Sequence, residues 1–254
     1  EQVAALTGAA AADVVFTSSG TEANNLAIKG VAQAYGGRGR HIITSRIEHK
    51  AVLDACESLT SSGFEITCLE PDEFGTISPD KLAQALRDDT TLVSLMHVNN
   101  ELGSINDIAA LSALCADHQA FFHVDAAQSV GKLPINLAEL KVDLLSVSAH
   151  KCYGPKGIGA LYVKRRSQCQ LRPQIHGGGH ERGMRSGTLA THQIVGLGAA
   201  AALAGERMAA DREYLSVLRQ RFWQQVQTLG QVQLNGSESG WPGIINISFA
   251  GVDG

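Results

Sequence analysis

Short apolar segments alternate with segments of helical periodicity along most of this chain. The apolar segments predict β-strands at residues 14–16, 41–44, 64–69, 92–98, 121–124 and 144–147. The periodic segments between them predict helices at residues 22–35, 51–59, 78–86 and 105–118. Such alternation is typical of parallel strands joined by right-handed helical crossovers. The sequence therefore predicts an α/β fold, with a mostly parallel sheet flanked by helices.

The C-terminal part of the chain has a different pattern. An alanine-rich segment at residues 194–229 predicts a long helix, which Gly205 could interrupt. Two short apolar runs, at residues 232–234 and 244–249, predict strands beyond it. A chain of 254 residues can form one large domain or two smaller ones. We expect a large domain at residues 1–205 and the beginning of a smaller α+β domain at residues 206–254.

Composition excludes several classes of protein. A net charge of only -4 argues against a nucleic-acid binder, and we see no apolar run of membrane-spanning length and no secretory signal. The chain has five cysteines, an odd number, and none forms a CxxC pair, so neither a disulfide framework nor a zinc site is expected. Cysteine usage of this kind favours a reducing compartment, and we expect a cytoplasmic protein.

The stretch at residues 142–159 places a lysine just after an apolar strand. It reads VDLLSVSAHKCYGPKGIG, so Lys151 follows the predicted strand and precedes a glycine-rich turn. Burial at such a position would lower the pKa of the amine, because the charged form loses its hydration. A lysine that is neutral part of the time is a nucleophile toward aldehydes. We interpret Lys151 as the residue that binds pyridoxal phosphate; a solvated lysine at a strand end is the alternative.

Parallel sheets bind their ligands at the carboxyl ends of the strands, and polar motifs follow several of the predicted strands here. Residues Ser18, Ser19, Gly20 and Thr21 stand between a strand and a helix. Small residues and free N–H groups at a helix start favour an anion such as phosphate. An ordinary helix N-cap is the alternative.

His49 and Asn100 follow two further strands. His49 can lie flat against an aromatic ring and move protons near pH 7; the alternative is a surface histidine near a helix start. The amides of Asn99 and Asn100 suit a carboxylate or a ring oxygen, although asparagine is also common in turns.

Asp125 ends the next apolar strand. Its carboxylate could pair with a protonated pyridine nitrogen and make that ring an electron sink; a helix-capping aspartate is the alternative. Gln128 could donate to the ring hydroxyl, and Ser148 and His150 could both donate to a phosphate. His123 shares the strand face of Asp125, and we interpret it as a packed residue behind the site.

A glycine-rich loop at residues 176–188 reads HGGGHERGMRSGT. Its two histidines, His176 and His180, are separated by glycines that disfavour a helix, so a metal site is not expected. Arginine, serine and threonine in one loop are better suited to an anion or to a contact between subunits.

Taken together, these motifs resemble a known family. The segments are SSGTEANN, TSRIEHKAV, MHVNNELG, HVDAAQSVGK, SVSAHKCYGPKGIGALYV and HGGGHERGMRSGTL. They are similar to the cysteine desulfurases, which are class V aminotransferase-like enzymes of the fold-type I pyridoxal phosphate group. The closest similarity is to the bacterial type that feeds iron–sulfur cluster assembly, and it covers nearly the whole chain.

The resemblance implies a role for each candidate residue. Lys151 would form the Schiff base with the cofactor, and His49 would stack on the ring and act as acid and base. The other cofactor residues implied are Gly20 and Thr21 at the phosphate with Ser148 and His150, Asp125 at the pyridine nitrogen, Gln128 at the ring oxygen, and Asn100 beside the ring. Thr188 would reach the phosphate of the neighbouring subunit in a homodimer.

The resemblance further implies an L-cysteine substrate, an L-alanine product, and a persulfide passed to an iron–sulfur scaffold protein or another acceptor. In this family a mobile-loop cysteine carries that persulfide, and none of the five cysteines here lies in that motif. The chain begins at Glu1, so we expect a fragment that lacks an N-terminal arm and the C-terminal cysteine region. The alternatives are a selenocysteine lyase, a small-amino-acid transaminase, or a non-catalytic subunit of a sulfur-transfer complex.

Overall fold

The structure is a computed structural model that describes residues 1–164 and 169–252. Its main strands are β1 (Val14–Thr17), β2 (His41–Ser45), β3 (Glu65–Leu69), β4 (Thr90–Met96), β5 (Phe121–Asp125), β6 (Leu144–Ser148) and β7 (Gly159–Val163). These strands form one seven-stranded sheet in the order β1-β7-β6-β5-β4-β2-β3. Each strand predicted for this region is present, with ends shifted by one or two residues.

The direction of the strands determines where the polar motifs lie. Strands β2 to β6 pair in parallel, whereas β7 is antiparallel to both β6 and β1. The link between β6 and β7 is too short for a crossover helix, which makes an antiparallel pair the accessible connection. The prediction of a mostly parallel sheet is confirmed. Strand β1 runs in the same direction as β6, so the carboxyl ends of β1, β2, β4, β5 and β6 share one edge.

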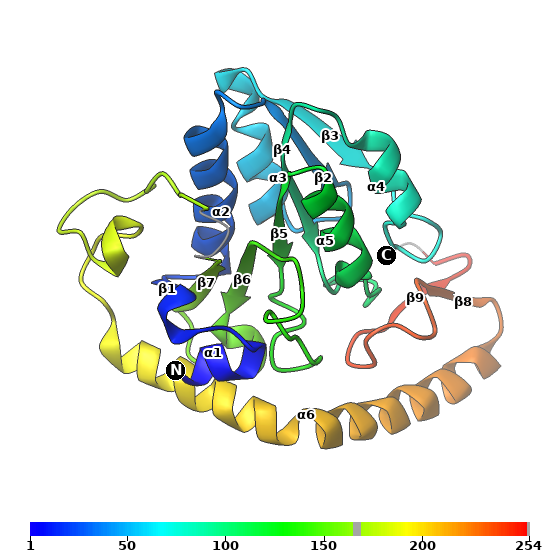
Figure 1. The fold of residues 1–254 in the computed structure, drawn as a ribbon. Coiled ribbons are helices and arrows are strands. Elements are labelled where there is room, and N and C mark those ends of the chain that lie inside the picture. Colours follow the sequence, from blue (N-terminus) through cyan, green and yellow to red (C-terminus); the bar gives the residue numbers. More distant parts are fainter. Residues whose placement is uncertain (165–168, 253–254) are drawn as a thin grey trace.

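Helices cover both faces of the sheet (Figure 1). They are α1 (Gln2–Thr7), α2 (Gly20–Tyr35), α3 (Lys50–Glu57), α4 (Pro79–Ala85), α5 (Ile108–Asp117) and α6 (Thr191–Val226). Successive strand residues point to opposite faces. Ile42 and Leu144 therefore pack with α2 and α3, while Ile43 and Leu145 pack in the core formed with α1, α4, α5 and α6. Burial of each such side chain stabilises the fold by about 1.5–3 kcal/mol.

Helix α6 is continuous through Gly205, so the predicted interruption at this glycine is wrong. A glycine costs about 1 kcal/mol in a helix interior, which a helix of this length can absorb. A Cβ at position 205 would lie 3.4 Å from the Leu6 side chain of α1, an ordinary van der Waals distance, so the packing of α1 does not require glycine there. Figure 1 shows α6 passing along one side of the molecule toward the C-terminal hairpin. Within the described residues, no helix has both the length and the hydropathy to cross a bilayer.

The C-terminal segment forms a two-stranded antiparallel sheet from β8 (Val232–Asn235) and β9 (Asn246–Phe249), as predicted. Trp241, in the loop between them, is buried with Val98 and Leu215. Arg219 of α6 donates to the carbonyl oxygens of this loop. The division into domains 1–205 and 206–254 stays a prediction; its boundary falls inside α6, and residues 253–254 lie outside the described residues.

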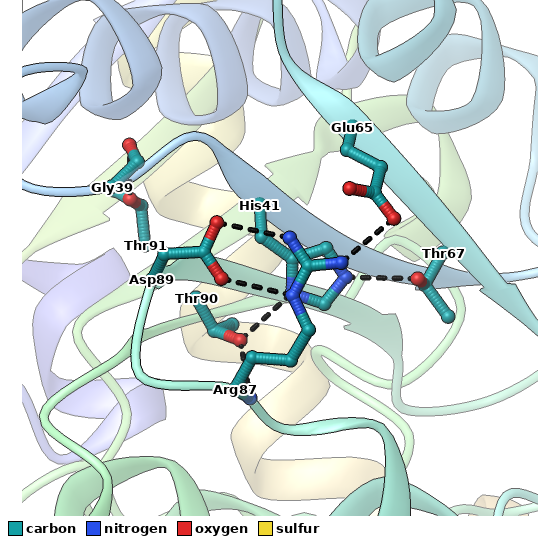
Figure 2. Close-up of polar contacts among 8 residues, drawn as sticks. All are labelled: Gly39, His41, Glu65, Thr67, Arg87, Asp89, Thr90 and Thr91. Atoms are coloured by element: carbon teal, nitrogen blue, oxygen red, sulfur yellow. Dashed lines mark hydrogen bonds and ion pairs between the residues drawn. The ribbon is translucent and has the colours of Figure 1, made fainter.

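The amino-terminal edge of the sheet is held by a polar network (Figure 2). The His41 ring is fully buried and lies 2.8 Å from the hydroxyls of both Thr90 and Thr67. Arg87 makes two hydrogen bonds of 2.9 Å to the Asp89 carboxylate and one of 2.7 Å to Glu65. These contacts join β2, β3 and β4 at the edge opposite to the polar motifs.

This network predicts sensitivity to acid. Burial and the neighbouring Arg87 lower the pKa of His41, so the folded protein resists protonation of a group that protonates near pH 6.5 when unfolded. Its contribution to stability is present above about pH 6.5 and is lost as the pH falls. The free energy of unfolding of the full-length protein, measured in urea at pH 8 and pH 5.5, should fall less on acidification in H41Q than in the wild type. H118Q, at an exposed histidine, is the control and should keep the wild-type loss; an equal loss in H41Q would contradict the assignment.

Candidate functional site

A cavity of about 320 Å³ lies at the carboxyl edge of the sheet. Every cofactor residue predicted from the sequence lines it except Thr188. The predicted residues that line it are Gly20, Thr21, His49, Asn100, Asp125, Gln128, Ser148, His150 and Lys151. They come from the ends of five strands, so the parallel sheet brings together residues as far apart in the sequence as Gly20 and Lys151.

The start of α2 forms the anion-binding part of the cavity. Ser19 caps the helix by accepting a hydrogen bond of 3.1 Å from the Glu22 N–H, so the N-cap interpretation is correct as well. First-turn N–H groups have no partner within a helix, and the helix dipole favours negative charge there. A Cβ at Gly20 would lie 3.1 Å from the Ser148 Cβ. Glycine therefore lets the helix start approach β6, where Ser148 and His150 supply further donors.

Asp125 supplies a buried carboxylate. Its Oδ1 accepts a hydrogen bond of 2.9 Å from the Ala127 N–H, and its Oδ2 accepts one of 2.7 Å from the Asn24 side chain. Burial raises the pKa of Asp125, while these two donors and the charges of His49 and Lys151 oppose that rise. A cationic group brought into the cavity would stabilise the ionised carboxylate further.

Asn24 is a residue that the sequence analysis missed. It lies on the cavity side of α2, three residues after Thr21, and is almost fully buried. Its Oδ1 has no hydrogen-bond partner among the described residues. A buried amide on an otherwise apolar helix face is the signal that could have identified it.

His49 is exposed and caps α3, and its ring also lines the cavity. Its Nδ1 accepts a hydrogen bond of 3.1 Å from the Ala51 N–H. In the neutral ring the proton therefore sits on Nε2, which leaves that nitrogen available for proton transfer.

Glu48, the neighbour of His49, does not line the cavity but is a buried carboxyl to which the sequence analysis assigned no role. Its Oε1 accepts hydrogen bonds from the Ser45 hydroxyl at 2.7 Å and the Met96 N–H at 3.0 Å, while its Oε2 is buried without a partner in the described part of the chain. Burial raises the pKa of Glu48 to about 8, and the nearby Asp125 adds to that effect. Glu48 is therefore mostly protonated at neutral pH and ties the end of β2 to the end of β4.

Lys151 lies in a one-turn 3-10 helix, Ala149–Cys152, directly after β6. The expectation that burial desolvates this amine is wrong, because Lys151 is exposed. The turn carries the side chain out of the sheet to the mouth of the cavity. Cys152 is buried and its thiol donates to the Ala149 carbonyl at 3.2 Å, in agreement with its interpretation as a packing residue.

His123 packs behind the cavity, as expected. Its ring is fully buried and lies 2.8 Å from the Ser94 hydroxyl and 2.9 Å from the Ser146 hydroxyl. Burial lowers its pKa to about 3, so the ring stays neutral and joins β4, β5 and β6.

The loop at residues 176–190 lies beside the start of α2. Arg185 forms a two-point ion pair with Glu22, whose other contact is the Ser18 N–H. Glu181 accepts from the Phe16 N–H and Arg182 donates to the Val14 carbonyl, so both side chains occupy the open edge of β1. Among the described residues, no three histidine, cysteine, aspartate or glutamate side chains are placed to hold a metal ion.

Thr188 is exposed in this loop and does not line the cavity of its own chain. It faces a separate hollow beside Ser18 and Arg185. Its predicted contact with the phosphate of a neighbouring subunit stays a prediction.

Comparison with known proteins identifies the family. The model of the family described as aminotransferase class-V matches residues 1–254. The chain belongs to the class-V aminotransferase family. It is 57% identical to the cysteine desulfurase IscS of Aeromonas salmonicida and 58% identical to that of Pseudomonas aeruginosa, in each case over all 254 residues. It spans 63% of the length of these relatives.

Solved structures agree with this assignment. A NifS-like protein, 36% identical, superposes with a TM-score of 0.95 over 99% of this chain and 69% of its own. DndA from Streptomyces lividans, 41% identical, gives 0.93 over 100% of this chain and 72% of its own. The predicted α/β fold of the fold-type I group is confirmed. This family depends on pyridoxal phosphate.

The cavity fits that cofactor. It offers a helix start and hydroxyl donors for a phosphate, a buried carboxylate for a pyridinium, and a lysine for an aldehyde. A side chain at position 20 would crowd Ser148, so glycine favours the close approach of the helix start to β6. None of the five cysteines, all within the described ranges, lines this cavity.

Glu48 predicts a loss of stability in alkali. Its folded pKa of about 8 is above its unfolded value near 4.5, so its contribution is complete at low pH and is lost as the pH rises through about 8. In E48Q the amide is neutral at every pH, and this loss should disappear. The free energy of unfolding is measured in urea at pH 6 and pH 9 for both proteins. The difference E48Q minus wild type should be larger at pH 9 than at pH 6. E57Q, at an exposed carboxylate, is the control and should show the same change in free energy of unfolding with pH as the wild type. If E48Q shows that same change, Glu48 is not buried as a neutral acid.

Proposed function

We propose that this protein is a cysteine desulfurase that converts L-cysteine to L-alanine and passes the sulfur on as an enzyme persulfide. The observation that carries the proposal is the single cavity in which Lys151, Asp125 and the start of α2 meet. The identity of 56–58% to proteins named cysteine desulfurase IscS supports this reaction over others of the family. A structure described as SspA in complex with cysteine, 40% identical with a TM-score of 0.86, supports the same substrate.

Each residue of the cavity has a task in this proposal. Gly20, Thr21, Ser148 and His150 hold the cofactor phosphate, and Asp125 keeps a proton on the pyridine nitrogen. Asn24 holds Asp125 in place through its 2.7 Å hydrogen bond. When bound, pyridoxal phosphate supplies an electron sink for negative charge at the substrate α-carbon.

Lys151 and His49 act on protons and on the reacting carbon. Lys151 would supply the amine that holds the cofactor aldehyde. Lys151 then takes the α-proton, whereas His49 donates a proton from Nε2, which carries the proton of the neutral ring because Nδ1 accepts from the Ala51 N–H. Asn100 lies at the cavity wall, where its amide can orient the substrate carboxylate.

The thiol that receives the sulfur lies outside this cavity. All five cysteines are buried or half-buried away from it, and burial raises the pKa of Cys56, Cys115 and Cys169, which disfavours a reactive thiolate. We propose that a cysteine on another segment or molecule accepts the sulfur. An iron–sulfur scaffold protein as one destination, a homodimer and a cytoplasmic location complete the proposal.

Replacement of Lys151 tests the reaction. K151A should lose the visible absorbance of bound pyridoxal phosphate, and production of alanine and sulfide from L-cysteine should fall by at least about 10²–10⁴-fold. K156A, at an exposed lysine of the following turn, is the control and should retain both signals.

The same assay separates the alternatives. Turnover of selenocysteine but not cysteine, or transfer of an amino group to a keto acid, would replace the proposed reaction with another of this family. Stable binding to a scaffold protein without any uptake of pyridoxal phosphate would identify a non-catalytic subunit.

Thr188 tests the proposed homodimer. T188A should weaken cofactor binding by about ten- to a hundredfold, because a hydrogen bond to a charged phosphate is lost. A heterodimer of K151A and T188A chains, purified with two tags, should regain one tight site if Thr188 acts across the subunits. Recovery of no tight site would place Thr188 in the cofactor site of its own subunit, and unchanged cofactor binding by the T188A homodimer would place it outside cofactor binding.

A further inference from the structure

Gln128 and Lys132 lie one helical turn apart in the segment after β5. The Ser129 N–H donates to the Ala126 carbonyl, and the Lys132 N–H donates to the Ser129 carbonyl. These two hydrogen bonds make the segment a compact turn. Gly131 adopts a positive φ of 76°, and a Cβ there would lie 2.9 Å from Ala204 of α6. Packing against α6 thus determines the path of the turn and the placement of Lys132.

Lys132 donates a hydrogen bond of 2.6 Å to the Oε1 of Gln128. The two residues line different cavities. Gln128 lines the cofactor cavity, and Lys132 lines a separate cavity of about 430 Å³ beside Cys152, Ala204 and Arg207. Lys132 is half-buried, and among the described residues Gln128 is the hydrogen-bond partner of its amine.

This contact determines which end of the Gln128 amide faces the ligand. Burial and the nearby Lys151 lower the pKa of Lys132 to about 8, so at pH 7 it is still mostly an ammonium. An ammonium has three donors and no acceptor, so the amide must turn its oxygen to Lys132. With its oxygen engaged by Lys132, the Gln128 amide has both N–H donors of its NH₂ group left for the cavity. The wall therefore favours a ligand atom that accepts a hydrogen bond.

We propose that Lys132 is a positioning residue that holds Gln128 with its NH₂ group toward the ring oxygen of pyridoxal phosphate. This inference rests on the proposed function, which supplies the ligand. Lys132 touches neither cofactor nor substrate; it acts through the amide. The site thereby favours a ring that carries an oxygen acceptor over the same ring without one.

A cycle of protein variants and ligands tests this role. The apo forms of the full-length wild type and K132M are titrated at pH 7 with pyridoxal phosphate and with 3-deoxypyridoxal phosphate, which lacks the ring oxygen. K132M should weaken binding of pyridoxal phosphate by about five- to tenfold, the effect of one hydrogen bond, and leave binding of the 3-deoxy analogue unchanged. K132E should weaken pyridoxal phosphate more, because a carboxylate would attract the NH₂ group and turn the amide oxygen to the cavity.

K141M, at a lysine whose ion pair with Asp117 is exposed, is the matched control and should bind both ligands as the wild type does. Equal weakening of both ligands in K132M would show a purely structural role and overturn the proposal, as would unchanged binding of both. A wild-type protein that takes up neither ligand would refute the proposed function itself. If K132M does not fold, K132Q is tested instead, because its side chain keeps a shorter hydrogen-bond donor. K132Q should weaken binding of pyridoxal phosphate by less than K132M would, and it should leave binding of the 3-deoxy analogue unchanged.

Discussion

The buried carboxylate of Asp125 is the group around which the site is built. Removing a carboxylate from water is costly, and burial alone would drive it to take up a proton. Two hydrogen bonds, from Asn24 and from the Ala127 N–H, keep it in place and oppose that protonation. A ligand cation is the natural partner for a carboxylate arranged in this way.

Glu48 shows the opposite outcome for the same type of group. It is equally buried, but its hydrogen bonds come from a serine hydroxyl and one backbone N–H, and Asp125 adds an unfavourable charge. Its pKa of about 8 makes it a neutral acid that links two strand ends. Two carboxyl groups near one cavity thus have different tasks, because their surroundings differ in donors and in charge.

Stability and function are divided between the two edges of the sheet. At the amino-terminal edge, His41 and Arg87 join three strands through hydrogen bonds between side chains (Figure 2). At the carboxyl edge, glycines and polar residues keep a cavity open. The open edge of β1 is covered by side chains of the 176–190 loop, which blocks pairing with another strand.

The sequence by itself determined the strands, the mostly parallel sheet and nine of the residues that line the cavity, since apolar periodicity and polar residues at strand ends are local properties. It did not identify Asn24 or Glu48, because their roles depend on which strands become neighbours. It placed Lys151 in a desolvated position, whereas a single 3-10 turn exposes that side chain. Only the tertiary structure decided which amide face Gln128 presents, because packing of the turn against α6 sets the position of Lys132, and an ammonium can only donate.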